Sequence, residues 1–408
     1  MHGTVDREAE GTSLIGLAGP TYFPVAFMAR LPYAMMVVGV LTLVVAGRGS
    51  LGFAGLSSAC VGVGVAAFGP LLGAAADRFG QRRVVLVAGI VNGFALSALA
   101  WLVFSPLPGG AVLAGAFAVG ASAPQVSPLS RSRLVGMIAR GLPESRHARV
   151  TTGLMAYESA ADEVIFVFGP VIVGLLATTL NPAAPMIGAA VLTALFVTAF
   201  ALHPSAREVA EHEERAEQAS KGELVRPGLL AVYTGVLGMG LFFGSALTGL
   251  TAFMQDLGHA ERAGLFYGVM GVGSAACALA TALVPARYPL AARWLVSAVT
   301  MLIGSAIVAT ASTLPVMLIG MLVAGVGVGP TLVTEFSLAS ARSPRGRAST
   351  VMTIAGSGII VGQSAASAIN GWLADSLGTA AAQCAPAVAS AVILSAALWN
   401  RFLSRNAF

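Results

Sequence analysis

The sequence has little charge, and this shortage excludes an ordinary soluble protein. Only 10% of the 408 residues are Asp, Glu, Lys or Arg, whereas 56% are apolar. Soluble domains carry roughly 25% charged residues. The longest polar stretch, about 203–227, is too short to bury a core of its own. The chain is therefore expected to lie mainly in a lipid bilayer, without a separate soluble domain.

Residues that carry catalytic, metal or nucleotide chemistry are also scarce. The three cysteines lie in or beside apolar runs without metal spacing, and we interpret them as small hydrophobic residues. The five histidines fall in predicted loops or tails. HExxH, Walker, CxxC and GxSxG motifs are all missing. These absences argue against an enzyme, a metal site and an ATP-driven pump, and we expect no cofactor beyond a proton gradient.

A cleaved signal peptide is not expected either. The first 13 residues carry more acid than base, whereas a signal peptide begins with a basic region. The first apolar run, 22–46, is longer than a signal peptide's apolar segment and should remain as a membrane span.

What the chain does have is a series of long apolar runs, each near the roughly 20 residues that a membrane helix needs. Reading these runs between charged or Pro/Gly-rich breaks predicts twelve spans. They are 22–46, 51–75, 84–104, 109–130, 153–179, 183–203, 228–253, 263–286, 294–312, 314–339, 348–374 and 379–402.

Basic residues predict how these spans are oriented. If both termini are cytoplasmic, 20 of the 23 basic residues fall on the cytoplasmic side, including Arg131 and Arg133 in the loop after span four. Only Arg48 and Arg262 fall outside, and Arg30 lies within span one. The positive-inside rule therefore places both termini in the cytoplasm. The arginines are dispersed and lack aromatic interleaving, so we expect no nucleic-acid partner.

The chain divides into two similar parts. We predict an N-terminal half of six helices at 1–203, a cytoplasmic linker at 204–227 and a C-terminal half of six helices at 228–408. Pro143 and Pro344, about 200 residues apart, each open a short basic segment that leads into a span. The linker contains many glutamates and is interpreted as a surface helix or tether.

A motif lies between the second and third spans, where residues 73–83 read GAAADRFGQRR. This resembles the GxxxDRxGRR signature of the major facilitator superfamily and departs from it only at Gln81. With twelve spans and a six-plus-six repeat, the resemblance covers the whole chain. It implies an all-α membrane protein with the superfamily's fold, cytoplasmic termini and the activity of a transporter.

The resemblance also assigns roles to the motif residues. Gly73 lets neighbouring helices approach, and Gly80 supplies the turn. By resemblance, Asp77 faces the N-terminus of helix eleven near Ser349 and Thr350, where the helix dipole favours an anion. This contact would act as a latch that stabilises the outward-facing state. Arg78, Arg82 and Arg83 complete a cytoplasmic charge cluster. The alternative is that these charges only anchor the topology.

Two further segments match the superfamily less well. The corresponding loop of the second half, 285–293, lacks the aspartate and receives only a topological role. In helix five, Gly169, Pro170 and Gly174 partly resemble the Gly-Pro signature of drug/proton antiporters and predict a kink. Ile165 and Val173 replace two glycines of that signature. The arginine that antiporters commonly carry in helix four is also missing.

Charged residues inside spans are functional candidates because they are costly in lipid. Helix five carries Glu158, Asp162 and Glu163, span one carries Arg30, and span ten carries Glu335. We expect Arg30 to pair with Glu163 or Asp162, and the remaining carboxylate to bind the coupling proton, with a static ion pair as the alternative. Glu158 is expected to be solvated. For Glu335, snorkelling to the interface and a role in a cavity both stay open.

These features favour a proton-coupled secondary transporter that exports a small hydrophobic or drug-like molecule. The alternative within the class is a proton-coupled uptake symporter for a metabolite, and a sensor without flux or a membrane enzyme fits less well. Arginine outnumbers lysine 22 to 1, and alanine and glycine are abundant, which is typical of a GC-rich bacterial genome. We therefore expect a monomeric, multi-pass protein of the bacterial inner membrane, with lipid, protons and a small-molecule substrate as its partners.

Overall fold

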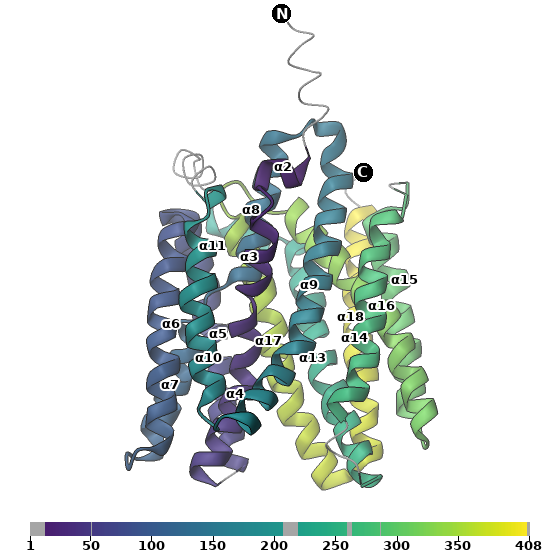
Figure 1. Ribbon diagram of the computed structural model, residues 1–408. Coiled ribbons are helices and arrows are strands. Elements are labelled where there is room, and N and C mark those ends of the chain that lie inside the picture. The colour runs from purple at the N-terminus through teal and green to yellow at the C-terminus, as the bar shows by residue number, and fades with distance from the viewer. Residues whose placement is uncertain (1–12, 50, 207–218, 259–262, 286, 406–408) are drawn as a thin grey trace, which may run out of the picture. The chain divides into compact units, whose positions relative to one another are not determined.

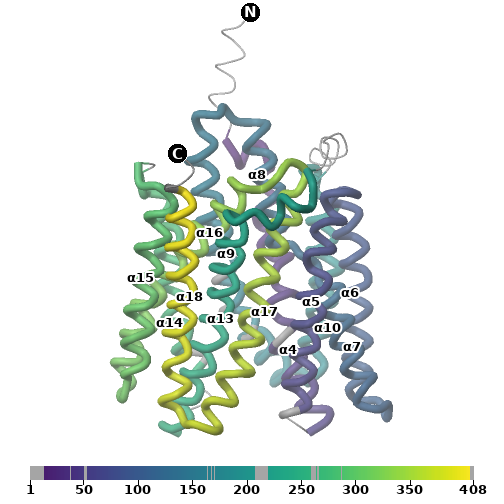
Figure 2. The backbone as a smooth tube through the Cα atoms, turned by 180° about the vertical axis from the view of Figure 1, so that it is seen from behind, coloured from purple at the N-terminus to yellow at the C-terminus, as the bar shows by residue number. Residues whose placement is uncertain are grey.

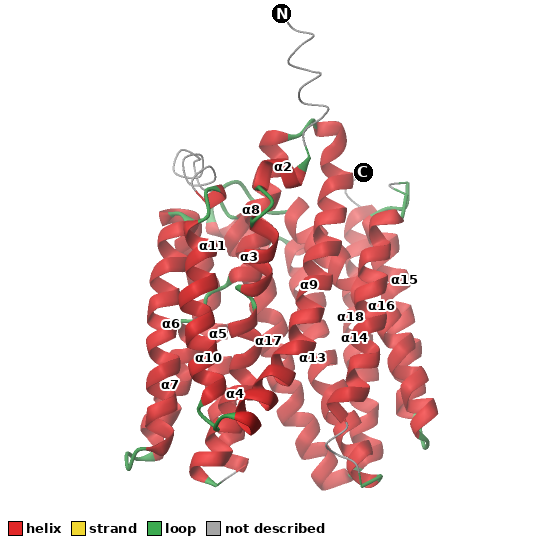
Figure 3. Cartoon of the chain, in the orientation of Figure 1, coloured by secondary structure: helices red, strands yellow, loops and turns green. Residues whose placement is uncertain are grey.

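The computed structural model describes residues 13–405 apart from 50, 207–218, 259–262 and 286. Every regular element among these residues is a helix, and Figure 3 shows no strand in the described part of the chain. Twelve helical stretches are long and apolar enough to cross a membrane, which confirms the predicted number of spans. The protein is therefore an all-α, multi-pass membrane protein.

The helices before the linker are labelled in Figure 1. They are α2 (Leu14–Ala18), α3 (Tyr22–Met28), α4 (Leu31–Arg48), α5 (Leu51–Phe79), α6 (Gln81–Phe104), α7 (Gly109–Ala121), α8 (Val126–Gly141), α9 (Glu144–Thr179), α10 (Ala184–Leu192), the π-helix η1 (Thr193–Val197) and α11 (Thr198–Leu202).

The remaining helices begin with a short 3-10 turn at the end of the linker. They are η2 (Lys221–Val225), α13 (Pro227–Asp256), α14 (Ala263–Ala280), the 3-10 turn η4 (Thr281–Leu283), α15 (Leu290–Ala309), α16 (Leu314–Ala341), α17 (Ala348–Leu377) and α18 (Thr379–Arg405).

Two predicted spans are each built from two helices. Span one breaks at residues 29–30, between α3 and α4, because Pro32 in the first turn of α4 has no N–H to continue the preceding helix. Span four breaks at 122–125, between α7 and α8, where Pro124 has the same effect. Span four also continues to Gly141, eleven residues beyond its predicted end at 130.

The chain forms two compact units that do not coincide fully with the predicted halves. Unit 1 comprises Met1–His147, Val164–Ala219 and Pro344–Ser357, and unit 2 comprises the rest. The differences concern two long helices. Residues 148–163 of α9 pack in unit 2, and α17 begins in unit 1 and continues in unit 2.

Within each unit the helices pack closely through small residues. In unit 1, α5 packs against α4, α6 and α7, and a Cβ on Gly120 of α7 would overlap the backbone of Val61 on α5. In unit 2, α15 packs against α16 and α18, and a Cβ on Gly329 of α16 would overlap the backbone of Ser274 on α14. Figures 1 and 2 show α6 beside α7, and α15 beside α16, from opposite sides. Glycine at these positions therefore lets the helices approach closely.

Candidate functional site

The aspartate of the loop motif lies in the last turn of α5. Gly80 has φ +84°, in the left-handed region that favours glycine, and it ends α5 so that α6 can begin at Gln81. The turn predicted at Gly80 is confirmed. Asp77 precedes this turn and is only 2% exposed, so its carboxylate must find hydrogen-bond donors inside the protein.

Those donors lie at the start of α17, which belongs to the same unit. Gly346, with φ +66°, turns the chain just before the helix, and the first N–H groups of α17 are left without intrahelical partners. The backbone N–H of Ser349 donates to Asp77 Oδ1 at 2.9 Å, and that of Thr350 donates to Oδ2 at 2.7 Å. The Thr350 hydroxyl adds a third bond at 2.5 Å. Asp77 therefore lies where the resemblance predicted, and the helix dipole stabilises its charge.

Gly73 brings the two helices close enough for these bonds to form. It lies one turn before Asp77 and is buried. A Cβ at this position would overlap Thr353 Oγ1 and lie 2.9 Å from the carbonyl oxygen of Ser349. The predicted close approach at Gly73 is therefore confirmed. We call Asp77 with the α17 groups of Ser349 and Thr350 the Asp77 site.

The one position at which the motif departs from the signature proves to be part of this site. Gln81 is 1% exposed, and its Nε2 donates to Ser132 Oγ at 3.0 Å and to Ser349 Oγ at 3.2 Å. Its Oε1 accepts from Arg133 Nε at 3.0 Å. Gln81 thus joins α6, α8 and the start of α17 within unit 1.

Arg131 and Arg133 were predicted to lie in the cytoplasmic loop after span four, and this prediction is wrong. Both residues lie in α8, which extends past the predicted end of span four at residue 130. Both side chains are at most 2% exposed. The Arg133 guanidinium carbon lies 4.0 Å from the Phe200 ring centre, and its Nη1 donates to the Phe200 carbonyl at 3.0 Å. Pro124 and Pro128 could have indicated that a new helix begins near residue 126, because proline is common at and just before the first turn of a helix.

The arginines of the motif itself lie towards solvent. Arg78 and Arg83 are exposed and Arg82 is partly buried, which is typical of a charged rim around a helix end. Arg78 lies over the ring of Phe79 at 5.2 Å. Their predicted role as a charge cluster stays a prediction.

A histidine completes the polar group around Arg133. His203 Nδ1 lies 2.9 Å from Ser205 Oγ, and its Nε2 lies 3.2 Å from Thr21 Oγ1. Partial burial lowers the pKa of His203, and the positive charge of Arg133 lowers it further. His203 therefore favours the neutral form in the folded protein.

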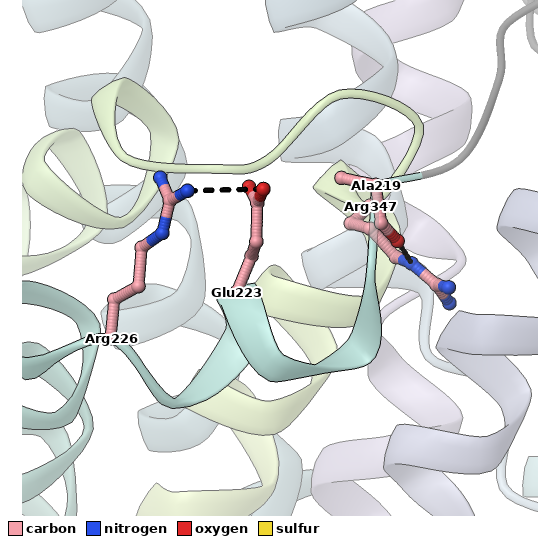
Figure 4. Close-up of polar contacts among 4 residues, drawn as sticks. All are labelled: Ala219, Glu223, Arg226 and Arg347. Atoms are coloured by element: carbon pink, nitrogen blue, oxygen red, sulfur yellow. Dashed lines mark hydrogen bonds and ion pairs between the residues drawn. The ribbon is translucent and has the colours of Figure 1, made fainter.

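The linker contacts the segment that leads into α17, as Figure 4 shows. The Ala219 N–H donates to the carbonyl oxygen of Arg345 at 3.1 Å, and Arg347 Nε donates to the Ala219 carbonyl at 3.0 Å. In unit 2, Arg226 pairs with Glu223 at 3.0 Å. Residues 207–218, which contain most of the predicted surface helix or tether, lie outside the described residues.

The predicted ion pair in spans one and five is only partly described. Arg30 is 3% exposed and lies at the break before α4. Asp162 is half-buried, and it belongs to unit 2 whereas Arg30 belongs to unit 1. The side chain of Glu163 lies outside the described part of the structure. The predicted pairing therefore stays a prediction. Glu158 was expected to be solvated, but it is wholly buried, so that expectation is wrong.

Glu335 is also fully buried, which excludes the expected alternative of snorkelling. Its carboxyl oxygens have no hydrogen-bond partner among the described residues. Trp294 and Gly235 lie next to it in unit 2. A side chain can snorkel only where a path to the interface is open, and close packing of α16 against α15 leaves none here.

The partial Gly-Pro signature receives a different structural explanation. Helix α9 runs without interruption from Glu144 to Thr179, and the Pro170 side chain lies outside the described part. A Cβ at Gly169 would lie 2.8 Å from Ala34 Cβ, so this glycine permits close packing, whereas Gly174 faces open space. Ile165, at a glycine position of the signature, is 2% exposed and packs in an apolar cluster. The predicted kink stays a prediction.

Among the described residues no group of three or more His, Cys, Asp or Glu side chains is placed to hold a metal ion. Twelve helical stretches of membrane-spanning length define a multi-pass membrane protein. The chain belongs to the Major Facilitator Superfamily, whose family model matches residues 22–367. The chain is therefore a transporter rather than an enzyme. No curated protein sequence matches it.

Solved structures of transporters share its fold at low sequence identity. The human organic anion transporter MFSD10 (TETRAN) is 17% identical with a TM-score of 0.67, covering 93% of this chain and 98% of that one. A bacterial homologue of the iron transporter ferroportin is 16% identical with a TM-score of 0.70, covering 93% and 97%. The proton:xylose symporter XylE is 14% identical with a TM-score of 0.65, covering 93% and 95%. The drug/proton antiporter subtype is not supported by these similarities.

Proposed function

We propose that this protein is a secondary active transporter that works by alternating access and couples export of a small hydrophobic or amphipathic molecule to proton entry. The observation that carries the proposal is the Asp77 site. Three donors from the start of α17 hold a buried carboxylate of α5. Hydrogen bonds to a charged group contribute about 1.5–3 kcal/mol each. Such a contact is strong enough to stabilise one conformation and weak enough to break when ligands favour the other.

The coupling ion and the cargo are proposed from the composition of the chain. Few charged residues lie within the spans, which suits an amphipathic cargo better than a sugar or a polyanion. Arg30, Asp162, Glu163 and Glu335 are the charged groups within spans that are candidates for proton coupling. The distribution of basic residues supports cytoplasmic termini. The excess of arginine over lysine, with abundant alanine and glycine, supports a place in the bacterial inner membrane.

A second candidate is uptake of a polar metabolite in symport with protons. The similarity to the proton:xylose symporter XylE favours it, because that protein has the same fold and its cargo moves with protons. In the first candidate the cargo moves in the opposite direction to the proton, and in the second it moves in the same direction. They share the Asp77 site and the need for a titrating group.

Everted membrane vesicles that carry the protein would test the proposal. The vesicles are energised until a fluorescent pH probe is quenched, and antibiotics and lipophilic cations are then added one at a time. Protein-dependent dequenching with at least one compound is expected for a proton-coupled exporter. The matched control is Glu223→Gln, a change at a partly buried residue of η2 outside the membrane spans, which should dequench as the wild type does. Absence of dequenching across a broad panel would contradict export, and uptake assays with metabolites would then decide on symport.

A further inference from the structure

The most unusual buried group in unit 2 is Glu335 of α16. Its side chain is 0% exposed, and both carboxyl oxygens are without a hydrogen-bond partner among the described residues. It also forms no ion pair with any residue of the described part of the chain. Burying an ionised carboxylate in this way is very unfavourable, whereas a neutral carboxylic acid can be buried at a much lower cost.

Two residues from other helices enclose this carboxyl. Trp294 of α15 is 0% exposed, and its indole is the polar neighbour of the carboxyl, although the indole N–H forms no hydrogen bond with it. A Cβ on Gly235 of α13 would overlap Trp294 and would lie 2.5 Å from Glu335 Oε1. The missing side chain of Gly235 therefore provides the space in which the indole and the carboxyl meet. We call Gly235, Trp294 and Glu335 the Glu335 site.

The charged and titratable groups of the helices packed on α16 have other partners or other positions. Arg293 of α15 donates to the carbonyl oxygens of Val284, Pro285 and Tyr288. Arg342, just beyond α16, donates to the Gly228 carbonyl and to Asn400. On α13, Tyr233 lies two residues from Gly235 and so on a different face of the helix, and Asp256 is the last residue, at the opposite end from Gly235. Helix α14 carries no charged residue, only Tyr267 and Cys277.

The groups that surround Glu335 favour a proton over a metal cation as its ligand. Metal cations bind through several oxygen ligands, about six to eight for calcium. The indole and the glycine beside Glu335 offer no side-chain oxygen. A proton needs only one carboxyl oxygen, and its uptake removes the charge that burial opposes. The exchange is balanced as a carboxylic acid giving a carboxylate and a proton to water.

A pair of hydroxyl groups lies between α15 and α16, one helical turn along α16 from Glu335. Thr331 precedes Glu335 by four residues on α16 and so shares its face. Its hydroxyl donates to Ser297 Oγ at 2.9 Å, and Ser297 follows Trp294 by three residues on α15. At a rise of 1.5 Å per residue this pair lies about 6 Å along α16 from Glu335. The pair makes no hydrogen bond to the carboxyl, but it places two further polar groups between α15 and α16 near Glu335.

We propose that Glu335 is the proton-carrying carboxyl of the transport cycle, protonated in the closed Glu335 site and deprotonated when the site opens to water. This inference rests on the proposed proton coupling. It assigns the coupling proton to unit 2, whereas the sequence favoured helix five. Trp294 and Gly235 are positioning residues that keep water away from the carboxyl.

Trp294 provides a test that does not depend on transport. The other three tryptophans, Trp101, Trp372 and Trp399, are exposed and are replaced by phenylalanine. Trp294 emission is then followed against pH in lipid nanodiscs. We expect a single titration that disappears in Glu335→Gln, is displaced along the pH axis in Glu335→Asp and is unchanged in Glu223→Gln. A Trp294 emission that does not change with pH, or a titration that persists in Glu335→Gln, would overturn the proposal.

A second measurement separates this proposal from the proposed function. In the everted-vesicle assay, Glu335→Gln is expected to reduce substrate-induced dequenching by about tenfold or more, because an amide cannot release a proton. Exchange of labelled for unlabelled substrate should persist, which also shows that the variant is folded. Normal dequenching in Glu335→Gln would overturn the assignment to Glu335 and leave proton-coupled transport intact. A Glu335-dependent titration without any dequenching in the wild type would instead contradict the proposed function alone.

Discussion

Asp77 of unit 1 and Glu335 of unit 2 are both buried acidic residues near helix ends, yet their surroundings are opposite. Asp77 accepts hydrogen bonds from the Ser349 and Thr350 N–H groups at the start of α17 and from the Thr350 hydroxyl. Glu335 accepts none among the described residues and lies against an indole. A carboxylate is stable in the first environment because donors replace water, and a neutral acid is favoured in the second. The same functional group can therefore serve as a fixed charge in one unit and as a proton carrier in the other.

The same amide substitution at both sites should sharpen this contrast most. In Asp77→Asn the side chain keeps one acceptor oxygen and turns its NH2 group towards donors. At about 1.5–3 kcal/mol for each hydrogen bond to a charged group, we expect a large loss of stability and transport reduced about tenfold or more. Glu335→Gln breaks no hydrogen bond and should leave the thermal unfolding temperature nearly unchanged. Thermal unfolding and vesicle transport are measured side by side.

Membrane insertion provides the control for this pair. Both variants are expected to insert and to elute as monodisperse protein, because neither change alters the apolar spans. Unchanged transport in Asp77→Asn would exclude the latch. Equal destabilisation by the two amides would remove the distinction between the two sites.

Glycine substitutions should have a smaller effect that again separates the two sites. Gly73→Ala places a methyl group against Thr353 and the Ser349 carbonyl, and Gly235→Ala places one against Trp294. Overpacking of this kind costs roughly 1–3 kcal/mol. We expect both to lower the unfolding temperature, but only Gly235→Ala should change Trp294 emission. Gly55→Ala on α5 and Gly268→Ala on α14 face open space and should be silent. An equal fall in the unfolding temperature in all four variants would mean that alanine perturbs these helices wherever it replaces glycine, independently of the two sites.

Substitutions at Gln81 would show whether the polar groups around the Asp77 site stabilise the protein. Gln81→Leu leaves Arg133 Nε without its acceptor and removes one donor from each of two serine hydroxyls, which should cost about 1–3 kcal/mol. Gln81→Glu keeps the acceptor for Arg133, and the serine hydroxyls can rotate to donate to it. We therefore expect Glu to preserve most of the stability that Leu loses, as measured by thermal unfolding. Equal losses would mean that only the shape of the side chain matters.

Much of the fold and part of the site could be predicted from the sequence. The twelve spans follow from hydrophobic length alone, and the turn at Gly80 follows from a residue that tolerates positive φ. The position of Asp77 beside α17 came from the family resemblance, because nothing local to residues 73–83 names a partner more than 270 residues away.

The remainder depends on contacts that no local pattern encodes. Arg133 is buried because the Phe200 carbonyl and Gln81 accept its hydrogen bonds, and both lie outside its own helix. A rule that counts arginines as loop residues therefore misplaces it. The burial of Glu335 likewise depends on the absence of a side chain at Gly235, on another helix. The break before α4 had a local signal in Pro32, which span length alone overlooks.

The smallest expected effect is a change in the pH dependence of stability, and it concerns His203 of unit 1. Burial and the charge of Arg133 hold the pKa of His203 below its usual value of about 6.5. The unfolded chain then binds the proton more readily than the folded protein does, so stability is full above about pH 6.5 and falls as the pH drops towards the folded pKa. His203→Gln, which cannot titrate, should flatten this decline in the unfolding temperature between about pH 7.5 and 5.5. An unchanged decline would assign it to another group. Because His203 is partly exposed and Glu335 lies in unit 2, the Trp294 titration should be the same in His203→Gln as in the wild type.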